Sequence, residues 1–154
     1  MKTLVAYFSA SGNTKSVAEN LAKIIEGELF EIEPTNPYTV ADLDYMDKQS
    51  RTTIEMEDKH SRPSIKNKIN NIDEYDKIII GFPVWWYTAP RIINTFIEEN
   101  DLKGKSIYIF VTSGGSSFGG SLKDLKESYP TLNFISGKTL NGILNKEEIS
   151  SWIL

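Results

Sequence analysis

Strand-like and helix-like segments alternate along this chain, and this alternation limits the possible folds more than any other feature. Runs typical of strands occupy residues 3–8, 28–33, 77–82, 106–112 and 132–135. Segments with the apolar spacing of one helix face occupy residues 14–25, 117–128 and 145–154, and a further helix opens at Pro90. Five strands alternating with helices predict an α/β fold: a doubly wound, three-layer sandwich in which helices cover both faces of a parallel sheet.

The length and the composition predict a single domain over residues 1–154. A chain of 154 residues that is 40% hydrophobic is long enough for one packed core and too short for two ordinary domains. Residues 34–71 interrupt the alternation, and we expect them to form a helix and a loop that ends at residues 61–63. No internal repeat or linker separates this insertion from the rest of the sequence.

The composition also excludes several classes of function. The chain contains no cysteine, which removes disulfides, thiolate nucleophiles, iron–sulfur clusters and cysteine-ligated zinc, so we expect redox chemistry only from a bound cofactor. The formal charge of −4 gives no basic footprint for nucleic acid, the apolar runs are too short to span a membrane, and the N-terminus lacks a secretory pattern. We therefore expect a cytoplasmic protein that binds neither nucleic acid nor membrane and attracts a basic redox partner.

The loop between the first strand and the first helix has the composition of a phosphate site. It consists of Ser9, Ala10, Ser11, Gly12, Asn13 and Thr14. Hydroxyl and backbone N–H groups at a helix N-terminus donate hydrogen bonds to phosphate, and the helix dipole attracts its charge. The loop lacks the patterns of triphosphate and dinucleotide loops, which favours a monophosphate. The alternative is that Ser11 and Thr14 only cap the helix.

An aromatic loop follows the third strand. Its candidate ligand-binding residues are Pro83, Val84, Trp85, Trp86 and Tyr87. Loops at the carboxyl ends of parallel strands are where open α/β sheets bind ligands. Adjacent aromatic side chains at this place predict walls for a flat ring. The alternative, for either tryptophan taken singly, is that it packs in the core beneath the next helix.

A glycine-rich loop follows the fourth strand. Its candidate residues are Thr112, Ser113, Gly114, Gly115, Ser116, Phe118 and Gly119. Glycines let the backbone approach a ligand closely, and its N–H groups can donate to a planar heterocycle, whereas a merely flexible loop is the alternative. With the strand order 2-1-3-4-5, all three loops converge on one rim of the sheet, at its topological switch point.

The three loops together resemble those of the flavodoxin-like family, over nearly the whole chain. Residues 7–14, Tyr-Phe-Ser-Ala-Ser-Gly-Asn-Thr, are similar to the family's loop for the phosphate of flavin mononucleotide (FMN). Residues 83–87 and 112–120 are similar to its two isoalloxazine loops. The resemblance implies a five-stranded parallel sheet and noncovalent FMN. It places the phosphate on Ser9, Ser11, Gly12, Asn13 and Thr14, and the ring against Trp85, Trp86 and the backbone of residues 113–119.

The resemblance leaves two functions open. We expect an FMN-binding electron-transfer protein, and the alternative is an NAD(P)H-dependent FMN oxidoreductase of the quinone-reductase type. The pattern Phe82-Pro83-x-x-Trp86-x-x-x-Pro90 is similar to the loop of flavodoxin-like quinone reductases, and residues 83–87 lack the glycine that many electron-carrier flavodoxins have there. The phosphate loop favours the carrier, as does the scarcity of basic residues in the three loops, where only Lys15 and Arg91 are near. We assign no catalytic or metal-binding residue, and we expect His60 in a surface loop.

Overall fold

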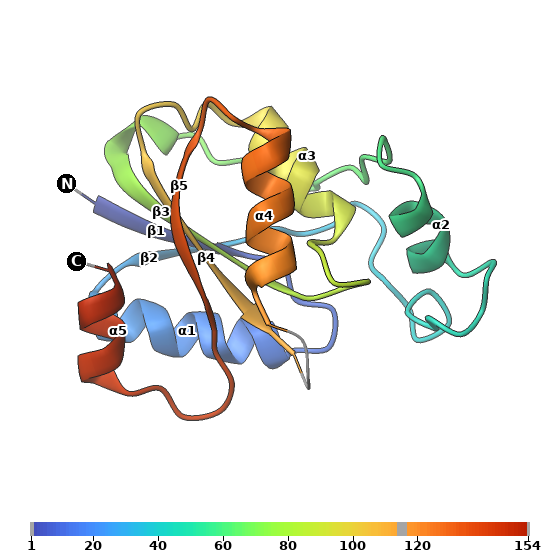
Figure 1. Ribbon diagram of the computed structural model, residues 1–154, viewed down its shortest axis with the longest axis horizontal. Helices are drawn as coiled ribbons and strands as arrows, with labels where there is room; N and C mark the ends of the chain where they lie inside the picture. Colours follow the sequence, from blue (N-terminus) through green and yellow to red (C-terminus); the bar gives the residue numbers. More distant parts are fainter. Residues whose placement is uncertain (1, 114–116, 154) are drawn as a thin grey trace.

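A computed structural model, which describes residues 2–113 and 117–153, shows one five-stranded sheet with every neighbouring pair of strands parallel (Figure 1). The strand order is β2-β1-β3-β4-β5, which confirms the predicted fold class. The strands are β1 (Lys2–Tyr7), β2 (Glu28–Glu31), β3 (Tyr75–Pro83), β4 (Ser106–Thr112) and β5 (Asn133–Thr139).

Helices cover both faces of this sheet. They are α1 (Asn13–Ile25), α2 (Arg51–Glu57), α3 (Arg91–Glu99), α4 (Gly119–Ser128) and α5 (Lys146–Ile153), with a short 3-10 helix, η1 (Ile72–Glu74). Apolar residues of α1 and α5 pack on one face, where Leu21 and Ile149 are buried. Those of α3 and α4 pack on the other face, where Phe96 and Leu125 are buried. Figure 1 shows the two pairs of helices on opposite sides of the sheet. The core therefore consists of two layers that hold the strand ends in fixed positions.

The carboxyl ends of two strands differ from the sequence prediction by more than one residue. β5 continues to Thr139 because it stays paired with β4 along its length, up to the pair Val111 and Thr139; its polar residues are tolerated at the edge of the sheet. β2 ends at Glu31 instead of residue 33, next to the end of β1 at Tyr7, whose carbonyl still accepts from the Ile32 N–H group (2.7 Å). Beyond this point a side chain bonds the outer edge of the chain. Asn67 donates to the Glu31 carbonyl (2.7 Å) and accepts from the Glu33 N–H group (3.2 Å).

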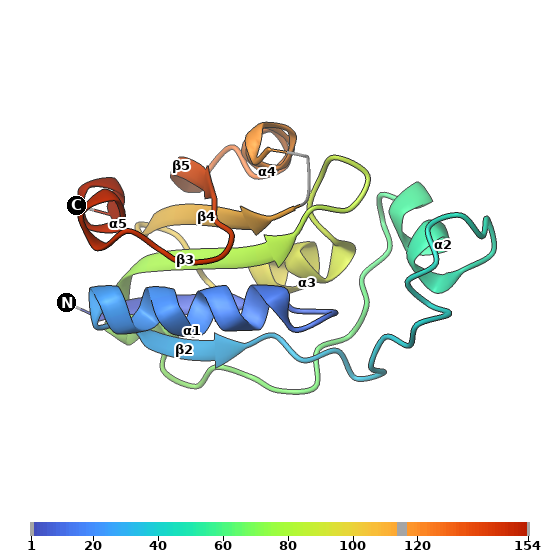
Figure 2. The same ribbon diagram turned by 90° about the horizontal axis from the view of Figure 1, so that it is seen from below.

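The insertion folds as an arm beyond the carboxyl ends of the strands (Figure 2). An antiparallel bridge between Pro34 and Ile65 closes its base. Its helix, α2, begins after Ser50, whose hydroxyl accepts a hydrogen bond from the Thr53 N–H group. Arg91 of α3 donates to the carbonyl groups at the other end of α2. The expected helix and loop are thus present, and they lie beside the rim where the three candidate loops end. None of the helices in the described part of the chain is long and apolar enough to cross a membrane.

Candidate functional site

The loop after β1 turns sharply and leaves the N-terminus of α1 open. Gly12 has a φ of +96°, a conformation that side-chain-bearing residues rarely adopt. Its N–H group donates to the Ser9 hydroxyl (3.0 Å). The first N–H groups of any helix lack intrahelical partners. Gly12 is the N-cap of α1 and has no side chain to accept from them. Exposed Ser11 and Asn13 flank this point. These donors suit a phosphate group.

Thr14 and Thr112 join the first loop to the third beneath this surface. Both residues are buried, and their hydroxyl groups lie 2.7 Å apart. Since the Thr14 hydroxyl is bonded to Thr112, its side chain holds the start of α1 against the end of β4. The expected residues of two loops are therefore in direct contact, as convergence on one rim requires.

The aromatic loop is a tight hairpin. Trp85 and Thr88 exchange two backbone hydrogen bonds, each 3.0 Å long. Between them Trp86 and Tyr87 have φ values of +49° and +63°, as in a type I′ turn, where glycine and asparagine are usual. Two large aromatic residues in this conformation store strain that the surrounding structure must offset. The turn leaves Trp86 and Tyr87 41% and 78% exposed.

The two tryptophans differ in environment. Trp85 is half-buried, and its ring makes edge-to-face contacts with Phe8 (5.5 Å between ring centroids) and Tyr38 (5.4 Å). Tyr38 belongs to the insertion and is covered by Arg51, whose guanidinium carbon lies 3.7 Å from the ring centroid. Trp85 thus anchors the insertion to the core, whereas Trp86 projects from the turn.

The third loop is described only at its two ends. Gly114, Gly115 and Ser116 lie outside the described residues. The Ser113 N–H group is 3.4 Å from the Asn141 side-chain oxygen, which links the end of β4 to the segment after β5. Phe118 lies against Gly137 of β5, where a Cβ atom would be 2.7 Å from the ring. Gly119 begins α4.

Two adjoining cavities follow the rim. One, of about 500 Å³, is polar where Ser11, Asn13, Ser16 and Thr112 line it. The other, of about 400 Å³, has aromatic and apolar walls. Both cavities include Ser11 and Pro83 in their lining, so they lie side by side. A phosphate group at one end and a flat ring at the other fit this pair of cavities. The second cavity brings together Ala10, Pro83, Val84, Trp85, Trp86 and Tyr87 of the predicted site.

Seven residues of these cavities were missed by the sequence prediction, and three of them are Ser16, Val17 and Gly142 of the polar cavity. Asn141 lines the polar cavity, and Leu43, Tyr45 and Thr52 of the insertion line the aromatic one. Asn141 follows β5, whose carboxyl end reaches the same rim, so the reasoning applied to the other strands would have found it. The insertion residues carry no such signal, because the folding of the arm determines their position.

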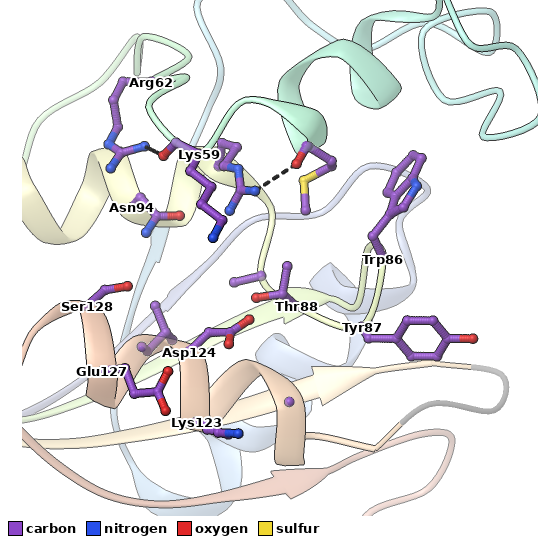
Figure 3. Close-up of a pocket in the computed structure, with 15 residues that line it drawn as sticks. Lys59, Arg62, Trp86, Tyr87, Thr88, Asn94, Lys123, Asp124, Glu127 and Ser128 are labelled. Atoms are coloured by element: carbon purple, nitrogen blue, oxygen red, sulfur yellow. Dashed lines mark hydrogen bonds between the residues drawn. The ribbon is translucent and has the colours of Figure 1, made fainter.

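A third cavity, of about 600 Å³, lies on the other side of the Trp86–Tyr87 turn, and we call it the α3–α4 cavity (Figure 3). Basic residues that the three loops lack come together here from other elements. Lys59 and Arg62 follow α2, Arg91 begins α3 and Lys123 lies on α4. Burial lowers the pKa of Arg91, and the charge of Arg62 lowers it further.

No group of His, Asp and Glu side chains in residues 2–113 and 117–153 could hold a metal ion. His60 is exposed in the loop after α2, as expected, and its backbone N–H group donates to the Asp58 carboxylate. Burial and the neighbouring Glu31 raise the pKa of Tyr7 to about 12, so its phenol stays protonated near neutral pH.

A family model for flavodoxin matches residues 2–154. The chain belongs to the flavodoxin family. This confirms the resemblance that the three loops carry. Among solved structures, this flavodoxin is 52% identical to a candidate flavoprotein from Bacteroides eggerthii, with a TM-score of 0.95 over 98% of this chain and 94% of that one. It is 26% identical to a Lactobacillus acidophilus flavoprotein in complex with FMN, with a TM-score of 0.75 over 98% and 97% of the two chains.

One curated relative of this flavodoxin is named for an enzymatic activity. It is an FMN-dependent NADH:quinone oxidoreductase from Mycoplasmoides gallisepticum, 26% identical over 121 residues. The match covers 75% of this chain and 60% of that protein. The flavodoxin chain thus spans less than two thirds of that relative's length.

Proposed function

We propose that this flavodoxin binds FMN without covalent attachment and transfers electrons through it. The observation that carries the proposal is the pair of adjoining cavities on the rim, polar around Ser11 and Asn13 and aromatic around Trp85 and Trp86. FMN has the matching shape, with a phosphate at one end and a flat ring at the other. The FMN complex of the Lactobacillus acidophilus relative supports the assignment.

The chain's own residues bind and orient the cofactor in this proposal. Ser11, Asn13 and the first N–H groups of α1 donate hydrogen bonds to the phosphate, and the positive end of the helix strengthens them. Trp86 and Tyr87 cover the ring and exclude water from it. Bound FMN supplies the redox chemistry, which no side chain of this cysteine-free protein provides.

Reconstitution tests this proposal. Apoprotein is titrated with FMN, FAD and riboflavin, and binding is followed through flavin fluorescence. We expect FMN to bind tightly at one molecule per chain. Riboflavin should bind far more weakly because it lacks the phosphate, and FAD because its phosphate is extended by a second nucleotide. Equal affinity for riboflavin would contradict the phosphate site, and failure of all three to bind would overturn the proposal.

A second candidate function is NAD(P)H-dependent oxidation and reduction through FMN. The α3–α4 cavity favours it, because basic residues line a space that reaches Trp86. The name of the Mycoplasmoides gallisepticum relative supports it also. In contrast, the formal net charge of −4 favours an electron carrier that docks on a basic protein partner.

Anaerobic mixing separates the two candidates. For a carrier, FMN-loaded protein should be reduced slowly or not at all by NADH or NADPH alone. A basic flavoprotein reductase should reduce it fast at low salt, and the rate should fall as ionic strength rises. Fast, saturable and salt-insensitive bleaching of the flavin band by NADH or NADPH alone, with a quinone as acceptor, would instead establish the oxidoreductase.

A further inference from the structure

The α3–α4 cavity has the dimensions of a ligand site. Its volume of about 600 Å³ lies within the range of small-molecule pockets. One wall comes from the loop after α2 and the start of α3, and the opposite wall comes from α4 (Figure 3). Trp86 and Tyr87 of the aromatic hairpin line both this cavity and the adjoining aromatic cavity of the predicted flavin site.

Arg91 is a half-buried cation without a carboxylate partner in the part of the chain that the structure describes. Its guanidinium donates only to backbone carbonyl groups of α2, to Met56 (2.7 Å) and Glu55 (3.3 Å). Arg62 differs, because Glu98 holds it in an ion pair (2.9 Å). The charges of Asp124 and Asp58 favour the Arg91 cation from beyond ion-pair distance, but burial outweighs them and the pKa of Arg91 is still lowered. An anionic ligand beside Arg91 would therefore be stabilised.

Lys59 adds to the same wall. Figure 3 shows its ammonium group directed into the cavity, with the carboxylate of Asp124 on the opposite wall. Neither Lys59 nor Lys123 makes an ion pair with any described residue. The wall of Lys59 and Arg91 is thus cationic. The α4 wall combines Lys123 with the acceptor groups of Asp124 and Glu127.

The opposed walls restrict the class of ligand. A simple inorganic anion would gain from Lys59 and Arg91 but would meet the carboxylates of Asp124 and Glu127. A molecule that carries both an anionic group and hydroxyl donors satisfies the two walls together, because carboxylates accept hydrogen bonds from hydroxyl groups. Trp86 at the border offers an aromatic face to a flat ring.

We propose that the α3–α4 cavity binds a nucleotide. Its phosphate lies against Lys59 and Arg91, its sugar hydroxyl groups donate to Asp124 and Glu127, and its flat base or ring reaches Trp86. This arrangement places the nucleotide beside the FMN site and separates the two by the Trp86–Tyr87 turn.

Calorimetric titration of ADP-ribose into the FMN-loaded protein tests this site. We expect saturable binding that Lys59→Gln weakens about threefold, as for a partly exposed charge pair. Lys126→Gln is the matched control, because Lys126 lies on α4 outside the cavity lining and should leave the affinity unchanged.

Inorganic pyrophosphate, titrated under the same conditions, separates a nucleotide site from a general anion site. It should bind at least about tenfold more weakly than ADP-ribose, since it lacks the sugar and the ring. Binding as tight as that of ADP-ribose would overturn the nucleotide assignment. So would the absence of saturable binding at millimolar ADP-ribose, or an equal loss in Lys126→Gln. Flavin absorbance of the same samples reports FMN occupancy separately, so a failure of FMN binding is distinguishable from a failure of nucleotide binding.

Discussion

The hydroxyl groups of Thr14 and Thr112 lie 2.7 Å apart in the core beneath the phosphate loop. Their hydrogen bond joins the first turn of α1 to the last residue of β4, although 98 residues separate the two in sequence. Each hydroxyl is buried, so removing one leaves the other without this partner. The relative position of two site loops depends on this bond.

Thr112→Val should therefore destabilise the protein by about 1–3 kcal/mol, the cost of one buried unsatisfied hydroxyl. The double variant Thr14→Val with Thr112→Val should recover most of that loss, because neither polar group then remains in the core. Urea unfolding of the apoprotein measures both values. Losses that simply add in the double variant would show that the hydroxyl pair does not act as a unit.

Gly12→Ala tests whether FMN binding depends on the backbone conformation of the phosphate loop. A Cβ atom at Gly12 meets nothing within 4 Å, but the φ of +96° is strained for alanine, at a net cost of about 1 kcal/mol. We expect FMN affinity to fall about tenfold, equivalent to one charge-assisted hydrogen bond.

Gly104→Ala is the control for this variant, since Gly104 also has a positive φ (+77°) and free space around its Cβ position. It lies before β4, at the opposite end of that strand from the site. Gly104→Ala should lower the free energy of unfolding in urea by a similar amount and leave FMN affinity unchanged. A similar loss of FMN affinity in both variants would assign the effect to general destabilisation.

Much of the fold was predictable because the three central strands, β1, β3 and β4, are largely buried. β4 begins and ends where its apolar run does, at Ser106 and Thr112, and the parallel order placed the three loops on one rim. The length of β5 was underestimated because residues 136–138 are polar or glycine, so the alternation of apolar and polar residues is lost there. Edge pairing, which the local pattern does not reveal, holds this part of the strand.

The contribution of the insertion to the site was not predictable. Tyr38 packs on Trp85 (5.4 Å), and Arg91 holds the carbonyl of Met56, 35 residues earlier in the chain. Such contacts depend on how the arm closes on itself, and no periodic apolar pattern in residues 34–71 specifies this. The α3–α4 cavity was missed for the same reason, since its cations come from three separate segments.

The two tryptophans should respond differently to substitution. Trp85→Leu should cost about 2 kcal/mol of stability, because the ring packs on Phe8 and Tyr38. Trp86→Leu should change stability by less than about 0.5 kcal/mol, as at other exposed positions, but should weaken FMN binding about fivefold through lost ring contact. Urea unfolding of the apoprotein and FMN titration measure the two effects. Equal stability losses would show that both rings belong to the core.

Gly120 should be intolerant of any side chain, because a Cβ atom there would lie 2.4 Å from the Tyr87 carbonyl oxygen. Gly120→Ala must displace the Trp86–Tyr87 turn or α4, at a cost of about 1–3 kcal/mol. The fluorescence of Trp86 should shift with the turn. Gly119→Ala, whose Cβ would have its nearest neighbour at 3.6 Å, should keep or slightly raise thermal stability, since alanine favours the helix. A Gly120→Ala protein as stable as Gly119→Ala would contradict the close contact.

The ion pair of Glu98 and Arg62 should make part of the stability depend on pH. The hydrogen bonds from Arg62, and to a lesser extent that from Tyr129, lower the pKa of Glu98 in the folded protein. A lowered pKa contributes stability above the unfolded-state pKa of about 4.3, and this contribution is lost as the pH falls through the folded-state value. Glu98→Gln should therefore cost about 0.5–1 kcal/mol at pH 7, a modest value because the pair is partly exposed, and the difference should shrink as the pH falls below the unfolded-state pKa. Glu99→Gln removes the same charge from a neighbouring position that makes no ion pair with a described residue, and it should change stability little at either pH. Urea unfolding at pH 7 and pH 3 measures all three proteins, and a Glu98→Gln deficit that is undiminished at pH 3 would show that packing, and not the ion pair, causes it.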